Sequence, residues 1–321
     1  MHIIFPDTSE YGQIMGWKVF FAIVETCVLF AVGGGALRIG YIGRDDIERW
    51  SRFTFNVFAP CLIFSSIAGG MGRNELASLW IMPLAGFLMM AAGAVLGLLM
   101  RPLLRHRNKA RLATFVHICA INNYIFLPLI VVENISGSGR HVALLMVMNV
   151  GSTVGFWTIG VMTLTGLRRD LLRHSLKQIF SINIAAVAAA VAVLLFDIAV
   201  PAAAMKIVRT LGSLTTPLIL ILTGAALFRD ASGLFAHKAD VAIVATVRLA
   251  VIPAIFIAAL KMLPLPRDIY EVCFVVALMP AAVASALVSR LYGGDGEFAS
   301  QAVVVTTLLA LVAVPLWILL I

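Results

Sequence analysis

The chain has 321 residues, of which 61% are hydrophobic and 12% are charged. A soluble globular protein carries about 25% charged residues, so this composition excludes the soluble classes and predicts a protein embedded in a lipid bilayer. The formal net charge is +8, but the basic residues lie in short segments between apolar runs. We expect them to orient the chain in the membrane, and we expect no nucleic-acid partner.

Ten apolar segments follow one another along the chain. Each is close to the roughly 20 residues that an α-helix needs to cross a hydrocarbon core of about 30 Å, and the short connections suit a compact bundle. We therefore predict an all-α integral membrane protein with ten transmembrane helices. The predicted spans are 14–37, 52–69, 78–100, 110–133, 141–165, 177–197, 204–228, 239–261, 269–290 and 298–321.

The first span carries Glu25 near its middle. A buried carboxylate can take up a proton near neutral pH, which makes Glu25 a candidate for proton coupling. The alternative is a structural role, either as a partner for another polar group or in a subunit interface. The same span contains the glycine run 33–35, and the third span contains the pair Gly93 and Gly97. Small residues at such spacings predict close helix packing.

The fourth span is the most informative one, because polar residues and a proline interrupt it. Asn122, Asn123 and Tyr124 are followed by Pro128, which has no N–H to donate and whose ring crowds the carbonyl four residues back. We therefore predict a break near Asn123 and Tyr124. Freed backbone groups at this depth are tolerated only inside protein or beside a water-filled cavity. These four residues are our first candidates for a substrate-binding site.

The ninth span has a comparable interruption at Pro280. Two interrupted segments at matching positions of two halves indicate the binding site of a transporter, although prolines also kink ordinary membrane helices. The small residues around Pro280 would let the two segments approach closely. Met279, Pro280, Ala281 and, one turn further, Ser285 therefore join the candidate site.

Other polar residues within apolar runs are further candidates. Arg248 in the eighth span can bind a carboxylate through two hydrogen bonds, which suits an anionic substrate; alternatively it reaches the interface or pairs with a carbonyl or an acid. His117 is a candidate for proton coupling, although a lone histidine on an apolar face is more often structural. Asn56, Asn149 and Thr153 either line the cavity or form hydrogen bonds between helices.

The basic residues are divided unevenly between the two sets of loops. The loops after spans one, three, five, seven and nine hold sixteen Lys and Arg residues, and the opposite loops hold six. The positive-inside rule places the richer set in the cytoplasm and both termini outside it.

Five spans precede a basic linker at residues 167–177, and five follow it. An odd number of spans gives the two halves opposite orientations in the membrane. The prolines of spans four and nine, and the tryptophans of spans five and ten, lie at similar offsets in the two halves. This weak symmetry predicts two inverted repeats, residues 1–166 and 178–321, on either side of the linker.

The sequence gives no indication of catalysis. It has no GxxxxGK[ST], HExxH or GxSxG motif and no recognisable pair of carboxylates within the membrane, so we expect neither an enzyme nor a cofactor. The four cysteines all lie within apolar runs and lack the spacing of a metal site or a disulfide framework, so we expect no metal.

Several stretches resemble the auxin efflux carrier family, which includes plant PIN-type auxin exporters and bacterial organic-acid permeases and is related to the bile-acid, arsenite and riboflavin transporters. The most specific is 277–317, ALMPAAVASALVSRLYGGDGEFASQAVVVTTLLALVAVPLW, and the resemblance covers nearly the whole chain. The others are FNVFAPCLIFSSIA at 55–68, NNYIFLPLIV at 122–131, LTTPLILILTGAALF at 214–228 and RLAVIPAIF at 248–256.

The resemblance implies inverted repeats of five helices whose fourth members are broken and cross near the bilayer centre. It also implies a scaffold of helices 1, 2, 6 and 7, a transport domain of helices 3–5 and 8–10 that moves like an elevator, and a homodimer through the scaffold. We therefore expect a secondary carrier of small organic anions, carboxylates or auxin-like acids, in the bacterial inner membrane. The alternatives are a sodium-coupled symporter of the bile-acid type and a membrane sensor on the same scaffold.

Overall fold

The computed structural model describes residues 10–106, 108–136, 139–166, 175–230 and 237–320, with side chains described at most of these positions from residue 21 onward. All regular secondary structure in these residues is helical. Six helical stretches are long and apolar enough to cross a membrane, which confirms an all-α membrane protein. They are 45–70, 73–103, 139–165, 202–229, 238–261 and 296–319.

The first half of the chain begins with α1, which spans Glu10–Arg38. Several of the helices that follow change locally to π or 3-10 geometry and then continue. They comprise α2 Arg44–Phe53, η1 Thr54–Phe58, α3 Ala59–Gly70, η2 Arg73–Ser78, α4 Ile81–Met100, η3 Arg101–Leu103, α5 Lys109–Ala120, α6 Phe126–Ser136, α7 Gly139–Gly155, η4 Phe156–Gly160 and α8 Val161–Thr165. Most of the predicted linker, from 167 to 174, lies outside the described residues.

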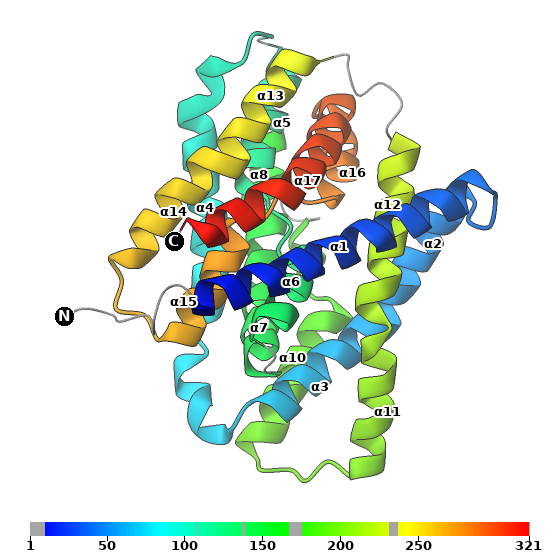
Figure 1. The fold of residues 1–321 in the computed structure, drawn as a ribbon, viewed down its shortest axis with the longest axis vertical. Coiled ribbons are helices and arrows are strands. Elements are labelled where there is room, and N and C mark those ends of the chain that lie inside the picture. The colour runs from blue at the N-terminus through cyan, green and yellow to red at the C-terminus, as the bar shows by residue number, and fades with distance from the viewer. Residues whose placement is uncertain (1–9, 107, 137–138, 167–174, 231–236, 321) are drawn as a thin grey trace.

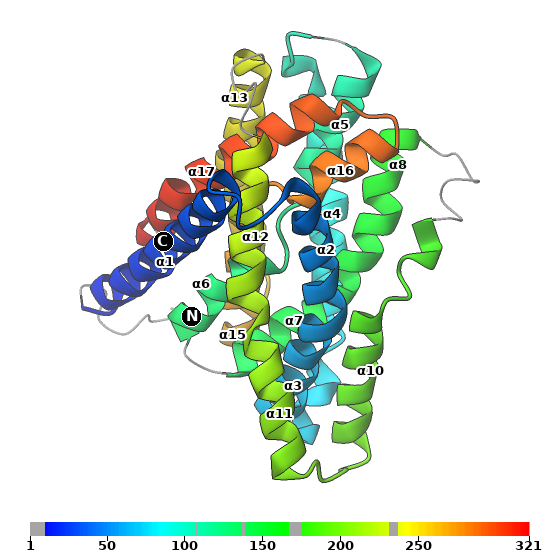
Figure 2. The ribbon, with the colours of Figure 1, turned by 90° about the vertical axis from the view of Figure 1, so that its right-hand side faces the viewer.

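The second half of the chain is also built from helices and contains one π segment among its described residues. Its elements are α10 Ile182–Leu195, α11 Ala202–Ser213, α12 Thr215–Asp230, α13 Lys238–Thr246, η5 Val247–Val251, α14 Ile252–Lys261, α15 Arg267–Ala277, α16 Ala284–Leu291 and α17 Gly296–Leu319. Figures 1 and 2 place α3, α10 and α11 together at one end of the molecule, and α1 crosses α12.

Two predicted spans are interrupted in their middle. The fourth divides into α5 and α6, with residues 121–125 between them, and the ninth divides into α15 and α16, with residues 278–283 between them. Pro128 lies in the first turn of α6, where a helix needs no N–H from that residue. The proline therefore fits the start of a new helix and excludes the continuation of the old one.

Glycines allow the closest helix contacts. A Cβ atom on Gly33 of α1 would lie 1.8 Å from the Ile221 carbonyl oxygen of α12, and one on Gly93 of α4 would lie 2.5 Å from the Cys119 carbonyl oxygen of α5. Gly97 makes a similar approach to α5, whereas a Cβ on Gly35 would meet no atom within 4 Å. The predicted packing role is confirmed for Gly33, Gly93 and Gly97.

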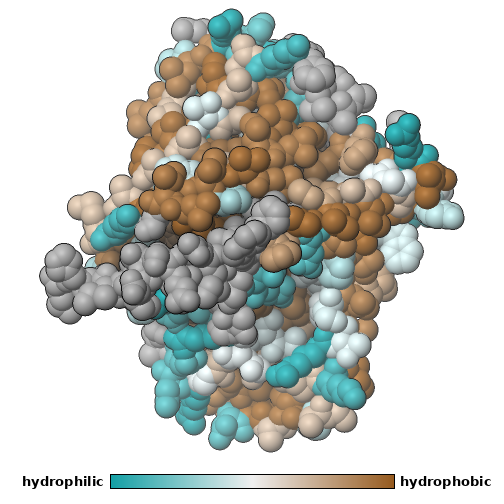
Figure 3. All heavy atoms as spheres, viewed as in Figure 1, coloured by the Kyte–Doolittle hydropathy of each residue, from teal (hydrophilic) through white to brown (hydrophobic). Residues whose placement is uncertain are grey.

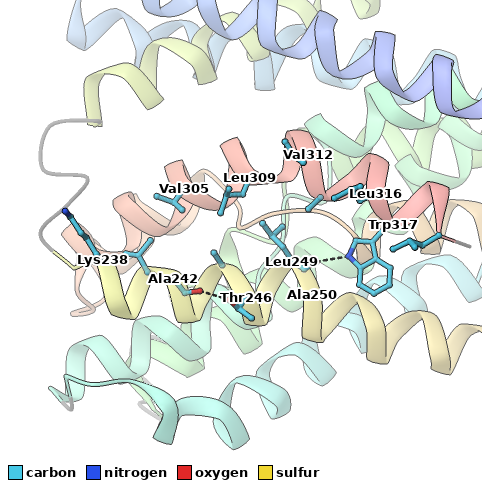
Figure 4. Close-up of a pocket in the computed structure, with 14 residues that line it drawn as sticks. Lys238, Ala242, Thr246, Leu249, Ala250, Val305, Leu309, Val312, Leu316 and Trp317 are labelled. Carbon is cyan, nitrogen blue, oxygen red and sulfur yellow. Dashed lines mark hydrogen bonds between the residues drawn. The ribbon is translucent and has the colours of Figure 1, made fainter.

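The π segment η5 has a clear physical cause. Pro253 has no N–H for an α-helical bond to the Leu249 carbonyl four residues earlier. The Trp317 indole Nε1–H of α17 donates to that carbonyl at 2.8 Å instead, as the dashed line in Figure 4 shows. The π turn places Arg248, its second residue, in the protein interior, where the side chain is 1% exposed.

A first charge network joins the beginnings of α5, α13 and α17. Arg111 lies 2.9 Å from the Asp295 carboxylate and 3.5 Å from the Asp240 carboxylate. Asp240 is also 2.9 Å from His106 Nδ1, and Arg111 Nη2 is 3.1 Å from His237 Nε2. These contacts tie together three helices that are far apart in the sequence.

A second charge network joins the beginnings of η2, α7 and α15. Arg140 forms ion pairs with both Glu75 and Asp268, and His141 Nε2 lies 2.9 Å from the Glu271 carboxylate. The second network thus resembles the first: in each, one arginine bridges two carboxylates on two other helices.

The surface of the described residues agrees with a membrane environment. In Figure 3 apolar residues cover much of the visible face around α13 and α17, and polar residues gather towards the upper edge and on the lower part. Large apolar side chains on α17 point outward, including Val312 at 61% exposed and Leu316 at 53%. Such a surface would be unstable in water and is normal against lipid.

Candidate functional site

The two interrupted segments meet and pair through an antiparallel β-bridge. Asn122 and Ala281 form an isolated β-bridge. The Asn123 N–H donates to the Pro280 carbonyl at 2.8 Å, and the Ala282 N–H donates to the Ile121 carbonyl at 3.2 Å. We call this pairing of residues 121–125 with 278–283 the crossing. It satisfies backbone groups that the two breaks would otherwise leave unpaired inside the protein.

Side chains hold the crossing in place. The Asn122 Nδ2 donates to the Val276 carbonyl near the end of α15 at 2.8 Å, and Asn122 is only 4% exposed. The Ala281 N–H is 3.4 Å from the Thr306 hydroxyl of α17. Met279 and Ala281 are fully buried. These groups build the crossing, and none of their side chains lines the cavity beside it.

A cavity of about 470 Å³ lies beside the crossing. One wall comes from residues 123–126 and from α16 with the residues just before it, and the opposite wall comes from α2, η1 and α12. Most of the lining is apolar, and Glu48, Arg229 and Arg290 provide the charged groups. A hollow of this size, with a few polar groups among apolar ones, suits a small organic molecule.

Asn123 is the amide side chain of the crossing that lines this cavity. Its Oδ1 accepts the Phe126 N–H at 3.2 Å and so caps the start of α6. Its Nδ2 is buried and has no hydrogen-bond partner among the described residues. An amide N–H₂ with unused donor capacity can bind an oxygen of a ligand.

The beginnings of two short helices also border the cavity. Phe126 and Ala284, the first residues of α6 and α16, both contribute to its lining. The first N–H groups of a helix lack helical partners and carry a partial positive charge. The cavity therefore receives positive potential from two helix ends as well as from its two arginines.

Tyr124 lines the cavity with an aromatic group. Its ring centroid is 6.2 Å from that of Phe156, and its side chain hydrogen-bonds to Thr153. Phe55 and Phe126 form a second aromatic pair in the wall, with centroids 5.1 Å apart and an edge-to-face angle of 75°. Aromatic pairs of this kind offer flat apolar surface to a ligand.

Arg248 lies beside the crossing and outside the cavity lining. Its Nε donates to the Met279 carbonyl and its Nη1 donates to the Cys119 carbonyl, each at 3.0 Å. Of the roles considered from the sequence, the geometry matches a partner for carbonyl groups. The guanidinium joins the end of the first half-helix to the second break.

Several candidates from the sequence lie away from the cavity. His117 is fully buried, and its Nδ1 must carry the proton because it lies 2.8 Å from the Gly160 carbonyl, which can only accept. Glu25 faces outward on α1, within electrostatic range of Glu133 on α6, a neighbour that the sequence did not reveal. Asn56 is exposed on η1.

The remaining candidates are buried in helix contacts. Asn149 Nδ2 lies 3.9 Å from the Met146 sulfur, and its Oδ1 has no partner among the described residues. Ser285 is fully buried on α16, between the lining residues Ala284 and Ala286. Pro128 is buried in α6 and Pro280 in the crossing, and neither lines the cavity.

Sequence reasoning missed most of the opposite wall. Ile219, Leu222 and Thr223 of α12 look like ordinary membrane-helix residues, and only their place across from the crossing makes them part of the cavity. Arg229 and Arg290 are two of the sixteen basic residues that the sequence indicates only as charges that orient the chain. A signal was present for these two, since Arg229 directly follows the seventh predicted span and Arg290 is the last residue of the ninth.

A second hollow, of about 750 Å³, lies between α13–η5 and α17 and is apart from the crossing (Figure 4). Lys238 marks one end and Trp317 the other, and the lining between them is mainly alanine, valine and leucine. The outward-facing side chains of α17 border it. Because it offers almost no polar group to orient a ligand, we regard it as a groove that lipid chains fill.

Comparison with known proteins also indicates a membrane transport protein. A family model described as a membrane transport protein matches residues 18–183 and 167–318. PIN-LIKES 4 of Arabidopsis thaliana is 27% identical to this chain over 115 residues, which are 35% of this chain and 28% of that protein. This chain therefore matches less than a third of the length of that relative. Because the family model extends over almost all of the sequence, the chain belongs to the auxin efflux carrier family of membrane transport proteins.

Proposed function

We propose that this protein is a secondary carrier of small organic anions and that the cavity beside the crossing is its binding site. The observation that supports this most directly is the position of Asn123, which lines a cavity that two helix beginnings border and whose buried Nδ2 has no partner among the described residues. Helix N-termini and amide donors are the groups that proteins use for carboxylates. Family membership agrees with this chemistry.

The walls indicate which anions would fit. Aromatic and aliphatic side chains dominate, and the charged groups are two arginines and Glu48, which is itself paired with Arg52. An amphipathic monocarboxylate would place its carboxylate near Asn123 and the helix beginnings, and its apolar part against Tyr124 and Phe156. Membership of the auxin efflux carrier family is consistent with auxin-like acids.

The two charge networks support a transport domain that moves as one body. The first connects α5, α13 and α17, and the second connects η2, α7 and α15. In the inverted-repeat scheme these are spans 4, 8 and 10 in one network and the equivalent spans 9, 3 and 5 in the other. The charges are reversed between spans 4 and 9 and between spans 5 and 10, whereas spans 3 and 8 both carry an acid. All six spans belong to the proposed transport domain, and α1, α3, α10 and α12 would be the scaffold.

The same scheme suggests an orientation. The rim residues Arg229 and Arg290 belong to the loops that the positive-inside rule assigns to the cytoplasm. The cavity would then be open to the cytoplasm, both termini would lie outside, and the membrane would be the plasma membrane. A homodimer through the scaffold stays a prediction, and cross-linking of single cysteines on the outward face of α1 would test it.

The experiment that tests the proposal is carboxylate binding and uptake by purified protein in liposomes. The probes are benzoate, phenylacetate, indole-3-acetate and malate. Asn123→Asp keeps an oxygen to cap α6 but replaces the Nδ2 donor with a negative charge. Since a hydrogen bond to a charged group contributes about 1.5–3 kcal/mol, we expect about 10- to 150-fold weaker affinity.

The matched control is Asn134→Asp, the same change near the other end of α6. Asn134 donates to the Ile130 carbonyl within α6 and does not line the cavity, so carboxylate affinity should stay close to wild type. Equal binding by wild type and Asn123→Asp, or equal losses in both variants, would place the site elsewhere. Absence of binding for every acid of the panel would contradict the anion proposal.

A further inference from the structure

Arg248 is a buried cation whose hydrogen-bond partners are backbone carbonyls. The residue is 1% exposed, and it contacts the Met279 and Cys119 oxygens. Among the described residues, no carboxylate forms an ion pair with it. Its Nη2 is also buried without a partner in the described part of the chain. An arginine in such a place stays charged, so the protein carries a fixed positive charge beside the crossing.

The two carbonyls are available because both helices end there. The α-helical partner of the Cys119 carbonyl would be the Asn123 N–H, but that N–H bonds to Pro280 across the crossing. Met279 follows the end of α15 at Ala277, so its carbonyl also lies beyond a helix C-terminus. Such oxygens carry the negative end of a helix dipole and attract cations.

Converging carbonyl oxygens at the ends of broken membrane helices are the groups that bind a coupling cation in sodium-driven carriers. Here a side chain fills that position. We propose that the Arg248 guanidinium acts as a tethered cation, which takes the place of a bound sodium ion at the crossing and makes the carrier independent of sodium. The claim that transport is independent of sodium rests on the proposed function. The claim that Arg248 neutralises the helix ends concerns the protein without substrate.

The arrangement separates the two signs of charge in the crossing. The ends of α5 and α15 face Arg248, while the beginnings of α6 and α16 border the cavity. The guanidinium neutralises the negative ends of α5 and α15. The positive beginnings of α6 and α16 can therefore attract an anionic substrate without opposition from those ends. A mobile sodium ion would provide the same neutralisation only while it is bound.

The first test uses charge and hydrogen bonding as separate variables. Arg248→Lys keeps the charge, and Arg248→Gln keeps hydrogen-bonding capacity without it. Melting temperatures of the purified variants without substrate should follow the order wild type, Lys, Gln. A glutamine variant as stable as the lysine variant, or more stable, would show that Arg248 stabilises the crossing only through its hydrogen bonds and would overturn the proposal.

The second test restores the cation from solution. Arg248→Ala should gain melting temperature, in a saturable manner, when choline chloride is replaced with guanidinium chloride at low millimolar concentration or with sodium chloride at equal ionic strength. Leu249→Ala is the matched control, because it opens space in the same π segment and keeps the charge. No cation-dependent gain in Arg248→Ala, or an equal gain in the control, would overturn the inference.

A measurement on the wild type remains decisive if the variants fail to fold. Its melting temperature should be the same in sodium and choline salts, whereas specific stabilisation by sodium would contradict the inference. None of these measurements involves a carboxylate. Failure of the anion proposal and failure of the tethered-cation proposal would therefore give different results.

Discussion

Asn122 and Asn123 are adjacent and identical, yet the structure assigns them separate tasks. The Asn122 side chain binds the Val276 carbonyl inside the protein, and Asn123 faces the cavity. We predict that Asn122→Ala lowers stability and leaves carboxylate affinity within about twofold of wild type, since a group that touches no ligand contributes little to binding. Asn123→Asp should show the reverse behaviour.

The size of the stability change can be worked out from the contacts. A hydrogen bond between membrane helices contributes about 0.6 kcal/mol on average and about 1.7 kcal/mol at most. The Val276 carbonyl keeps a second donor after the substitution, the Met279 N–H at 3.2 Å, so no acceptor is left unpaired. We therefore expect a loss of about 1 kcal/mol, to which the space left by the amide adds a similar or smaller amount.

The assay pairs thermal unfolding, followed by tryptophan fluorescence, with carboxylate affinity measured on the same preparations. For Asn122→Ala the melting temperature should fall and the dissociation constant should hold. For Asn123→Asp the melting temperature should hold, because the cap of α6 is kept, and the dissociation constant should rise. A weaker dissociation constant with unchanged stability in Asn122→Ala would refute this division of tasks.

Three further predictions concern the rest of the fold. Burial alone would raise the pKa of the Asp268 carboxyl, but hydrogen bonding and charge from Arg140 lower it below its usual value. The stability that this pair contributes is therefore present at neutral pH and is lost as the pH falls through that lowered pKa. In Asp268→Asn the melting temperature should fall less steeply as the pH is lowered. Gly33→Leu should separate α1 from α12 and lower the melting temperature, whereas Gly35→Leu, which meets open space, should change it little. Trp317→Phe removes the donor to a freed carbonyl in η5 and should cost about 1 kcal/mol in thermal unfolding; an unchanged melting temperature would show that this bond contributes nothing.

The membrane class and the positions of the breaks followed from the sequence because both depend on local chemistry. Apolar length fixes a membrane span, and Pro128 after two asparagines cannot lie in the middle of a regular helix. The structure has residues 121–125 outside the helices, where the sequence predicts the break. These signals need no knowledge of distant contacts.

The division of labour around the crossing could not be predicted in the same way. Asn122 and Asn123 carry the same side chain, and only the pairing with residues 278–283 decides which one turns inward. The sequence allows three interpretations of Arg248. The contacts that decide between them are with carbonyls that lie 31 and 129 residues away in the chain. The two charge networks join helices of both halves, so each acid or base by itself looked like an ordinary charge at a helix end.

The crossing also has a consequence for how the chain enters the membrane during synthesis. α5 has 12 residues and α6 has 11, so each reaches only about 18 Å and cannot span a core of about 30 Å alone. The polar backbone between them has its partners on a segment made much later, since Val276 lies 154 residues beyond Asn122. We therefore expect the fourth span to leave the translocon without its final structure and to complete its integration only when the ninth span has been made. Truncation before residue 280 should leave the fourth span open to aqueous cysteine reagents, and completion of the chain should close it.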